Sequence, residues 1–275
     1  MPELPEIRTL AEQMDRELAG SRITAVEVDQ EKCLNRSVDS VRRGLVGRTL
    51  GPFEAHGKWI RSPLAEGEAL AINLGMGAEV RLPRCAEEPP ENYKFRMHTA
   101  NGGGLFIRFW WFGHVHLLDG TGGESPMDRL GIDALDPALD CGAFRALLAG
   151  RRGGIKSFLL NQKNIAGIGN FYAHDLLARS GIHPMRPIPS LEPGEIGCLY
   201  RTMRDLLEAS VALGGADYER DLYGRPGGFS RRRFIVGYRE GEPCGRCGET
   251  VVKIRTGSTP GFICPDCQPE NPTGG

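Results

Sequence analysis

The 275-residue chain is long enough for one large domain or two modest ones, and 40% hydrophobic with 25% charged residues is a globular composition. A net charge of −1 and the lack of any apolar run near the ~20 residues of a membrane span exclude strongly basic and membrane-embedded classes. Because Met1-Pro2-Glu3 opens without a basic and apolar leader, we expect a cytoplasmic protein with no membrane partner.

The first 125 residues are expected to form one domain. A helix is predicted over residues 5–18, since proline suits its first turn and apolar residues recur at every fourth position. Runs typical of β-strands follow at residues 22–29, 69–74 and 105–111, separated by glycine-rich turns. The pattern over residues 1–125 predicts a β-sandwich with a leading helix.

The remainder of the chain has a different pattern. Residues 126–140 are rich in turn formers and indicate a linker, whereas amphipathic runs within residues 141–235 predict a helical domain. Residues 214–232 hold glycine, proline and arginine without periodicity, which suggests a mobile loop. The tail, residues 271–275, is expected to be disordered. The predicted fold class is therefore α+β with more than one domain.

Charge is distributed unevenly along the second half. Residues 145–190 carry seven basic side chains and one acidic, and residues 220–255 carry nine basic and four acidic. Contact with a polyanion depends on such local fields and not on the total charge. The two stretches fit either a nucleic-acid surface or an ordinary solvated one.

Four cysteines within residues 236–270 have the spacing of a tetrathiolate zinc site. Cys244 and Cys247 form one CxxC pair, and Cys264 and Cys267 form a second pair sixteen residues later. Each pair presents two thiolates, and the intervening residues can form a hairpin that brings the pairs together. Two disulfides are the alternative. We expect one structural Zn²⁺, whose four protein ligands leave no position open for catalysis.

The amino terminus offers a candidate nucleophile. If Met1 is removed, Pro2 becomes a secondary amine with a pKa of ~8, so a useful fraction is neutral and can attack an aldehyde to form a Schiff base. Glu3 and Glu6 lie beside it as candidate proton donors or acceptors. Alone, these residues also fit an ordinary helix start, where the dipole favours acids.

A glycine-rich turn precedes another predicted helix. Residues 165–171 read IAGIGNF, and exposed backbone N–H groups at such a helix start can bind a phosphate. Asn170 adds a side-chain donor, and Lys156 and Lys163 add positive charge. A generic glycine helix cap is the alternative.

Six segments in order along the chain carry a resemblance to a known family. They are MPELPEI at 1–7, HGKWI at 56–60, LGMG at 74–77, IKSFLLNQKNIAGIGNFYAHD at 155–175, GIHP at 181–184, and GEPCGRCG with FICPDCQ within 241–268. Over essentially its whole length the chain resembles the formamidopyrimidine-DNA glycosylase / endonuclease VIII family of base-excision-repair enzymes. The resemblance implies a bifunctional DNA glycosylase and abasic-site lyase that flips and excises a damaged base.

The resemblance also implies roles for single residues. Pro2 would attack the deoxyribose C1′ and Glu3 would open the sugar ring, after which β- and δ-elimination cut the strand. Lys58 would contact phosphate and assist base removal, and Asn170 would clamp a phosphate within a helix–two-turn–helix domain. The zinc hairpin would enter the minor groove of double-stranded DNA. Two basic residues, Arg151 and Lys156, would lie beside the DNA backbone and the lesion, and the protein would act as a monomer.

Two positions depart from the family pattern. The usual purine-lesion enzymes fill the hole left by the flipped base with methionine, arginine and phenylalanine, but here Met76 and Phe112 flank a tryptophan, Trp111. Tryptophan stacks on bases but cannot donate two hydrogen bonds to an orphaned cytosine, so weak opposite-base discrimination is implied. Alternatively, Trp110 and Trp111 lie on a sandwich strand, with only one pointing inward.

The zinc hairpin departs as well, because residues 256–262 lack the arginine that usually contacts phosphates beside the lesion. Arg255, Ser258 and Thr259 are candidates to replace it, as are the arginines at residues 231–233. Two further functions stay open: a non-catalytic lesion- or structure-specific DNA-binding protein, and a zinc-ribbon interaction module that accounts only for residues 241–268. Pro2 and Glu3 favour the enzyme. The sequence leaves open whether oxidised purines, oxidised pyrimidines or bulky lesions are the substrate.

Overall fold

The computed structural model describes residues 1–82, 92–119, 125–257 and 259–270 of the chain. The chain forms two compact units. Unit 1 comprises Met1–Arg129 with Gly214–Gly228, and unit 2 comprises Leu130–Leu213 with Phe229–Gly275. Residues 271–275, expected to be disordered, and Ser258 lie outside the described residues.

Unit 1 begins with helix α1, Leu4–Leu18, close to the predicted bounds. The helix has a proline in its first turn, and a capping box between Glu3 and Glu6 satisfies backbone N–H groups that would otherwise lack partners. Its buried apolar face includes Ile7, Leu10, Met14 and Leu18, which recur at helical spacing. That face joins the core of the sandwich.

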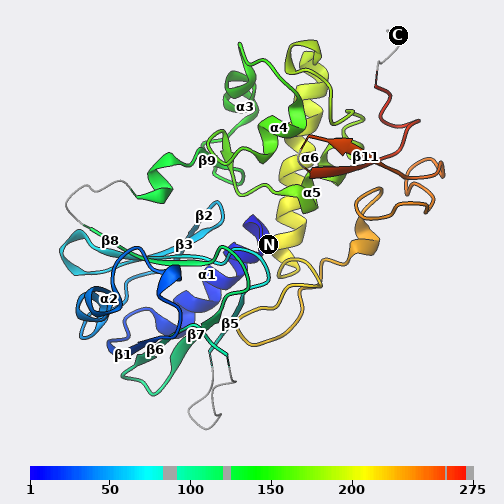
Figure 1. Ribbon diagram of the computed structural model, residues 1–275. Coiled ribbons are helices and arrows are strands. Elements are labelled where there is room, and N and C mark those ends of the chain that lie inside the picture. Colours follow the sequence, from blue (N-terminus) through cyan, green and yellow to red (C-terminus); the bar gives the residue numbers. More distant parts are fainter. Residues whose placement is uncertain (83–91, 120–124, 258, 271–275) are drawn as a thin grey trace. The chain divides into compact units, whose positions relative to one another are not determined.

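Among the described residues of unit 1, eight strands form two antiparallel sheets of four strands each (Figure 1). The first has the order β1 (Ile23–Val28), β6 (Phe95–Thr99), β7 (Gly104–Arg108) and β5 (Glu79–Arg81). The second has the order β2 (Glu54–His56), β3 (Trp59–Pro63), β4 (Ala69–Asn73) and β8 (His114–Leu118). Buried apolar residues of both sheets, α1 and α2 (Val38–Leu45) form one core, which confirms the predicted sandwich.

The chain leaves the sheet earlier than the sequence pattern predicted. β7 ends at Arg108, and Phe109 is the last residue of this run that points into the core. Gly113 lies against the Phe109 ring, so closely that a Cβ would fall 1.7 Å from Cδ1, and Phe112 adopts a positive φ of 55°. The alternative in which Trp110 or Trp111 points into the sandwich is therefore wrong, since both are mostly exposed.

The segment Gly214–Gly228 belongs to unit 1, although the sequence pattern placed it in the helical domain as a mobile loop. The Ala216 N–H donates to Glu6 Oε1 at 2.8 Å, and the Leu222 N–H donates to Gln13 Oε1 at 2.9 Å. Leu222 itself is fully buried in the sandwich core. Gly215, with φ +85°, allows the close approach, because a Cβ there would lie 2.8 Å from the Glu6 side chain. The segment has no regular helix or strand but is fastened along α1.

The described part of unit 2 contains four α-helices and two small sheets (Figure 1). The helices are α3 (Cys141–Leu148), α4 (Ile155–Leu160), α5 (Asn170–Arg179) and α6 (Pro193–Ala212). The parallel pair is β9 (Ile132–Asp133) with β10 (Ile165–Ala166), and the antiparallel hairpin is β11 (Val252–Thr256) with β12 (Thr259–Ile263). Short 3₁₀ helices complete the described chain: η1 (Glu31–Cys33), η2 (Ala65–Gly67), η3 (Pro126–Arg129), η4 (Ile188–Ser190) and η5 (Arg231–Arg233).

Helix α5 is the centre of unit 2. Its residues 171–178 are all buried, and the Tyr172 hydroxyl lies 2.6 Å from Ser210 Oγ of α6. Within the described chain, we find no helix that combines the length and the hydropathy needed to cross a bilayer. The residues 126–140 expected to be a linker contain η3 and β9, and β9 pairs with β10.

Candidate functional site

The amino terminus and two acids lie together at the start of α1. Pro2 is buried, and Glu3 and Glu6 are only 3% and 4% exposed. Glu6 Oε2 accepts a hydrogen bond from the Glu3 N–H at 2.8 Å, while Glu6 Oε1 holds Ala216. Both oxygens of Glu6 are thereby used for structure. The Glu3 side chain accepts a hydrogen bond from the Glu6 N–H in the same capping box, and Glu3 is the acid next to Pro2 in the chain.

Lys58 approaches the same place from the second sheet. It follows Gly57, whose φ is +58°, in the two-residue turn that joins β2 to β3. Its ammonium lies 3.8 Å from the Met1 sulfur. The turn thus brings a positive charge to the chain terminus, as expected for a group that binds phosphate beside the nucleophile.

Asn73, at the end of β4, connects the Lys58 turn to the loop that carries Met76. Its Nδ2 donates to the Lys58 carbonyl, and its Oδ1 accepts from the Gly75 N–H, each at 3.0 Å. The sequence analysis did not single out this asparagine. Its position at the end of a predicted strand, directly before the LGMG motif at residues 74–77, could have indicated a role in shaping this site.

The residues predicted to fill the hole in DNA meet at one exposed loop, residues 109–113, which we call the aromatic loop. Met76 and Trp111 exchange backbone hydrogen bonds at 2.8 and 3.2 Å. Met76, Trp111 and Phe112 are 43%, 58% and 68% exposed, and Trp110 is 75% exposed. Gly75 permits this pairing, since a Cβ there would lie 2.1 Å from the Trp111 carbonyl. Trp110 is thus at least as exposed as the three residues predicted to contact DNA.

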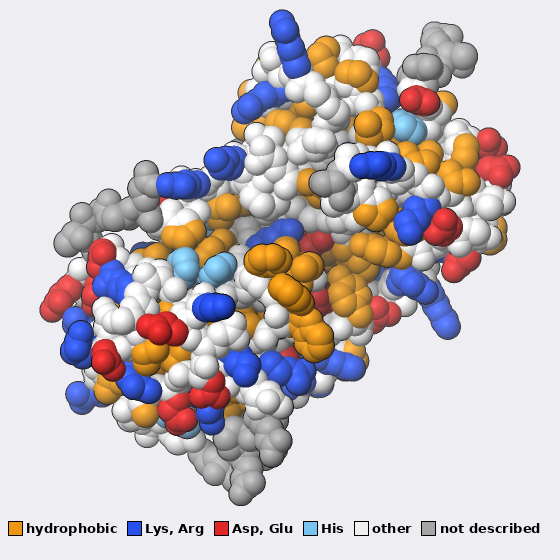
Figure 2. All heavy atoms as spheres, viewed as in Figure 1, with side chains coloured by type: hydrophobic (Ala, Val, Ile, Leu, Met, Phe, Trp, Pro, Cys, Tyr) orange, Lys and Arg blue, Asp and Glu red, His pale blue; other side chains and the backbone are white. Residues whose placement is uncertain are grey.

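An aromatic cluster covers the outer face of β3 and β8. The Trp59 ring stacks on His114 at 6.4 Å between centroids and contacts His116 at 5.3 Å. Burial, together with His114, lowers the pKa of His116 to about 4, so this ring is neutral at pH 7. In Figure 2, hydrophobic side chains and histidines lie among lysines and arginines on the face in view.

In unit 2, Asn170 is the first residue of α5 and follows a turn shaped by glycines. Gln162 holds that turn: its Oε1 accepts from the Gly167 N–H at 2.9 Å, and its Nε2 donates to the Ile168 carbonyl at 2.7 Å. Asn170 Oδ1 is buried without a hydrogen-bond partner. The turn thus leaves a polar group of Asn170 unsatisfied in the free protein, which is unusual for a buried oxygen.

Lys156 has a different place from the one expected. Its side chain is only 2% exposed, and its ammonium donates to Thr256 Oγ1 at 2.7 Å, Thr259 Oγ1 at 3.3 Å and the Pro260 carbonyl at 2.6 Å. All three donors of the ammonium are used at the tip of the β11–β12 hairpin. Arg151, by contrast, is exposed just beyond α3. In the free protein Lys156 holds the hairpin and leaves no donor for DNA.

The four cysteine sulfurs converge beside this hairpin. All lie within 4.8 Å of one another, which fits four ligands ~2.3 Å from a common Zn²⁺. Cys247 Sγ is 3.3 Å from Cys264 and 3.4 Å from Cys267, so it has two equal neighbours and is bonded to neither. Backbone N–H groups of Arg246 and Cys267 point at Cys244 and Cys264 sulfurs. This donor set suits a structural zinc and not two disulfides.

A buried carboxylate attaches the zinc finger to α5. Asp175 accepts from the backbone N–H groups of Ile235, Val236 and Gly237 at 2.8–3.1 Å and from Arg179 at 3.2 Å. Burial raises the pKa of Asp175, and these donors oppose that rise. Asp175 was not predicted from the sequence, because its backbone partners lie 60 residues or more away.

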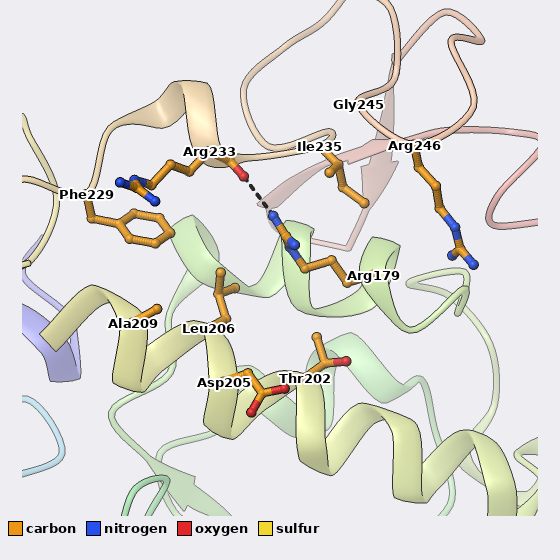
Figure 3. A pocket seen from close by; sticks show the side chains of 10 residues that line it. All are labelled: Arg179, Thr202, Asp205, Leu206, Ala209, Phe229, Arg233, Ile235, Gly245 and Arg246. Carbon is orange, nitrogen blue, oxygen red and sulfur yellow. Dashed lines mark hydrogen bonds between the residues drawn. The ribbon is translucent and has the colours of Figure 1, made fainter. Parts of the chain in front are cut away.

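A pocket of about 710 Å³ lies beside this attachment (Figure 3). Arg179, Arg233 and Arg246 line it together with Asp205, and apolar side chains form the remaining wall. Arg179 donates to the Arg233 carbonyl at 2.7 Å, while the guanidinium groups of Arg233 and Arg246 point away from each other. The arginines therefore do not converge on one ligand.

Replacing Lys156 should loosen the hairpin without removing the metal. In Lys156→Met the acceptors at the tip lose their donor, so we expect the free energy of unfolding to fall by ~1–3 kcal/mol. Zinc content should stay at one per chain, and DNA affinity should fall. Lys163→Met, at an exposed lysine of the same unit, is the control. Denaturant unfolding and metal analysis measure the difference, and equal stability of both variants would contradict the assigned role.

The same lysine should leave a signature in the pH dependence of stability. Burial lowers the pKa of Lys156 to about 8, below the ~10.4 of an unfolded chain. Between these values the unfolded chain binds the extra proton, so the free energy of unfolding should rise with pH. Unfolding measured from pH 8 to 10 should show this rise in the wild type and lose it in Lys156→Met.

Comparisons with known proteins agree with this arrangement. Family models match in the order "Formamidopyrimidine-DNA glycosylase N-terminal domain" (residues 1–109), "Formamidopyrimidine-DNA glycosylase H2TH domain" (130–220) and "Zinc finger found in FPG and IleRS" (241–269). The formamidopyrimidine-DNA glycosylase of Pelotomaculum thermopropionicum is 33% identical over 98% of this chain and 99% of its own. That of Roseiflexus sp. is 34% identical over 98% and 100%.

Solved structures give the same result. The complex of Lactococcus lactis Fpg with abasic-site DNA is 25% identical, with a TM-score of 0.87 over 98% of this chain and 100% of that one. Its complex with Fapy-dG DNA has a TM-score of 0.88 at 25% identity and the same coverage. The zinc-finger match and the four converging sulfurs confirm the expected structural zinc. The chain belongs to the formamidopyrimidine-DNA glycosylase family, the base-excision-repair DNA glycosylases with AP lyase activity.

Proposed function

We propose that this chain excises damaged bases from double-stranded DNA and cuts the resulting abasic site through a Schiff base at Pro2, exposed when Met1 is removed. The observation that carries the proposal is the meeting of the chain terminus with Glu3 and Lys58 at one end of α1. A secondary amine, an acid and a phosphate-binding cation are the groups that imine formation on a DNA sugar requires.

The chemistry follows from these positions. The Pro2 nitrogen loses its proton and attacks C1′, and the glycosidic bond breaks so that the damaged base leaves and takes up a proton. Glu3 then protonates the sugar ring oxygen as its bond to C1′ breaks, and the ring opens to an iminium ion. The iminium withdraws electrons from C2′, so a proton is lost there and the 3′ phosphate leaves by β-elimination. A second elimination then releases the 5′ phosphate. Lys58 holds the phosphate during these steps.

Unit 2 is proposed to make the main contacts with the DNA backbone. Asn170 and exposed Arg151 are proposed to contact backbone phosphates, to which the Asn170 Nδ2 and the Arg151 guanidinium would donate hydrogen bonds. The tip of the zinc hairpin is proposed to enter the minor groove. Lys156 would position this tip through its hydrogen bonds to the hairpin. The protein is proposed to work as a cytoplasmic monomer.

Substrate choice is proposed from the relatives and the aromatic loop. Solved relatives hold DNA with an abasic site or with Fapy-dG, and we assign the same two substrates to this chain. Met76, with Trp111 and Phe112 of the aromatic loop, would enter the space left by the flipped base. Stacking by Trp111 is tolerant of base identity.

The covalent step can be tested by borohydride trapping on abasic DNA. Reduction of the imine should give a stable protein–DNA adduct, because the amine is bonded to C1′ at that stage. Pro2→Gly should reduce the adduct, and an amino-terminal tag should abolish it. A tagged protein that is trapped as well as the untagged one would remove Pro2 from the mechanism. An untagged protein that binds the DNA without any adduct would favour the non-catalytic alternative.

The zinc is expected to be needed for DNA binding and not for the chemistry. Cys264→Ser should lower metal content and DNA affinity together, since loss of a ligand unfolds the hairpin. Cys198→Ser, at a cysteine of α6 away from the cluster, is the control and should change neither. Metal analysis and fluorescence anisotropy give the two readouts. Normal affinity in a metal-free preparation would contradict this role.

Opposite-base discrimination should be weak. Excision of one lesion opposite each of the four bases should vary by less than roughly a hundredfold, or ~2.7 kcal/mol. Trp111→Ala should slow all four by a similar factor, since a stacking contact is lost from each, whereas Trp111→Arg should favour cytosine. Trp110→Ala tests whether the neighbouring ring takes part. Single-turnover rates measure these effects, and a larger wild-type preference would disprove the stacking role.

A further inference from the structure

An acidic side chain from the segment Gly214–Gly228 faces the chain terminus. Glu219 Oε1 lies 3.4 Å from the Met1 amine, and the Glu219 side chain is 13% exposed. No motif in the sequence pointed to this residue. It reaches the Met1 amine because the segment folds back on unit 1.

The position of Glu219 is determined by anchors on both sides. Three residues before it, Ala216 donates to Glu6, and three residues after it, Leu222 donates to Gln13 and is buried in the core. The Glu219 N–H also donates to the Ala216 carbonyl at 3.2 Å, which closes a turn. A carboxylate held in this way is pre-organised for the amine.

The charges around Glu219 favour proton exchange with the amine. Besides the terminal amine, the charged groups at this end of unit 1 are Glu3 and Glu6 of α1 and Lys58 of the β2–β3 turn. Burial raises the pKa of Glu219, Glu3 raises it further, and the amine opposes the rise. The raised pKa of Glu219 therefore lies closer to the pKa of ~8 that is typical of a terminal amine. Transfer of a proton between two groups becomes easier as their pKa values approach each other.

We propose that Glu219 is the general base that takes the proton from the Pro2 ammonium, a role that rests on the proposed function. The proton passes to Glu219 Oε1, and the freed nitrogen lone pair forms the bond to C1′ of the abasic aldehyde. The alkoxide oxygen accepts a proton from Glu3, and the proton that remains on the nitrogen then passes back to Glu3. Glu219 returns its proton to the hydroxyl group, which leaves as water and gives the iminium ion. Glu219 ends ionised beside the new positive charge, and Glu3 ends protonated.

Removal of Met1 is compatible with this contact. The amine moves inward by one residue, at most about 3.8 Å between successive Cα atoms. The Met1 amine lies 3.4 Å from Glu219 Oε1 and the Met1 sulfur lies 3.8 Å from the Lys58 ammonium, so removal of Met1 frees both groups and makes the Pro2 amine the new terminus beside them. Activation of the amine then depends on docking of the segment, because the base is carried by the segment and the nucleophile by α1.

The first test measures the amine itself, in the full-length processed protein labelled with ¹³C-proline. The Pro2 ring carbons are titrated by NMR in wild type, Glu219→Gln and Asp217→Asn. A nearby carboxylate stabilises the ammonium, so Glu219→Gln should lower the Pro2 pKa by about one unit. Asp217→Asn removes one charge from an exposed position of the same segment and should leave it unchanged. Equal pKa values in the two variants would overturn the contact.

The second test separates a base from a mere electrostatic neighbour. A lower amine pKa leaves more neutral amine at pH 7, so loss of a neighbour alone would speed borohydride trapping on abasic DNA. Loss of a base should slow it by about a hundredfold, and Glu219→Asp should recover part of the rate. Trapping in Glu219→Gln as fast as in Asp217→Asn would refute the role of Glu219. No adduct in the wild type would instead refute the proposed function.

Discussion

The buried carboxylate of Glu6 is the interaction on which the reactive end of unit 1 depends. One oxygen caps α1 through the Glu3 N–H, and the other fastens a distant segment through the Ala216 N–H. A carboxylate that is 4% exposed needs such partners, since an unpaired buried charge is strongly unfavourable. The same side chain therefore starts the helix, orients the terminus and sets where Glu219 lies.

Unit 2 is organised by two similar long-range polar contacts. Asp175 on α5 holds the backbone at residues 235–237, and Lys156 on α4 holds the tip of the β11–β12 hairpin. Asp175 and Lys156 are charged side chains, and each makes several hydrogen bonds to other groups of the protein. Together they fix both ends of the zinc finger to the helices, while the metal only links the two cysteine pairs.

Features with a local signal were predictable from the sequence. The apolar period of α1, the CxxC spacing and the glycines before Asn170 act over a few residues, and the structure has the elements they predicted. The docking of residues 214–228 was not predictable, because Gln13 and Leu222 are 209 residues apart and neither belongs to a periodic pattern. The exposure of Trp110 was not predicted for another reason. Aromatic residues favour strands, so the sequence pattern extends β7 through Trp111. Only the structure shows that the chain turns away after Phe109, where Gly113 packs against the Phe109 ring.

The aromatic loop has a consequence for the behaviour of the free protein in solution. Met76, Trp110, Trp111 and Phe112 expose large apolar surfaces side by side, an arrangement that soluble monomers usually avoid. Their backbone is held by the Met76–Trp111 pairing, so the rings cannot withdraw into the sandwich. The colloidal stability of the unliganded protein must then come from the charged side chains around the loop, and high salt, by screening them, favours self-association.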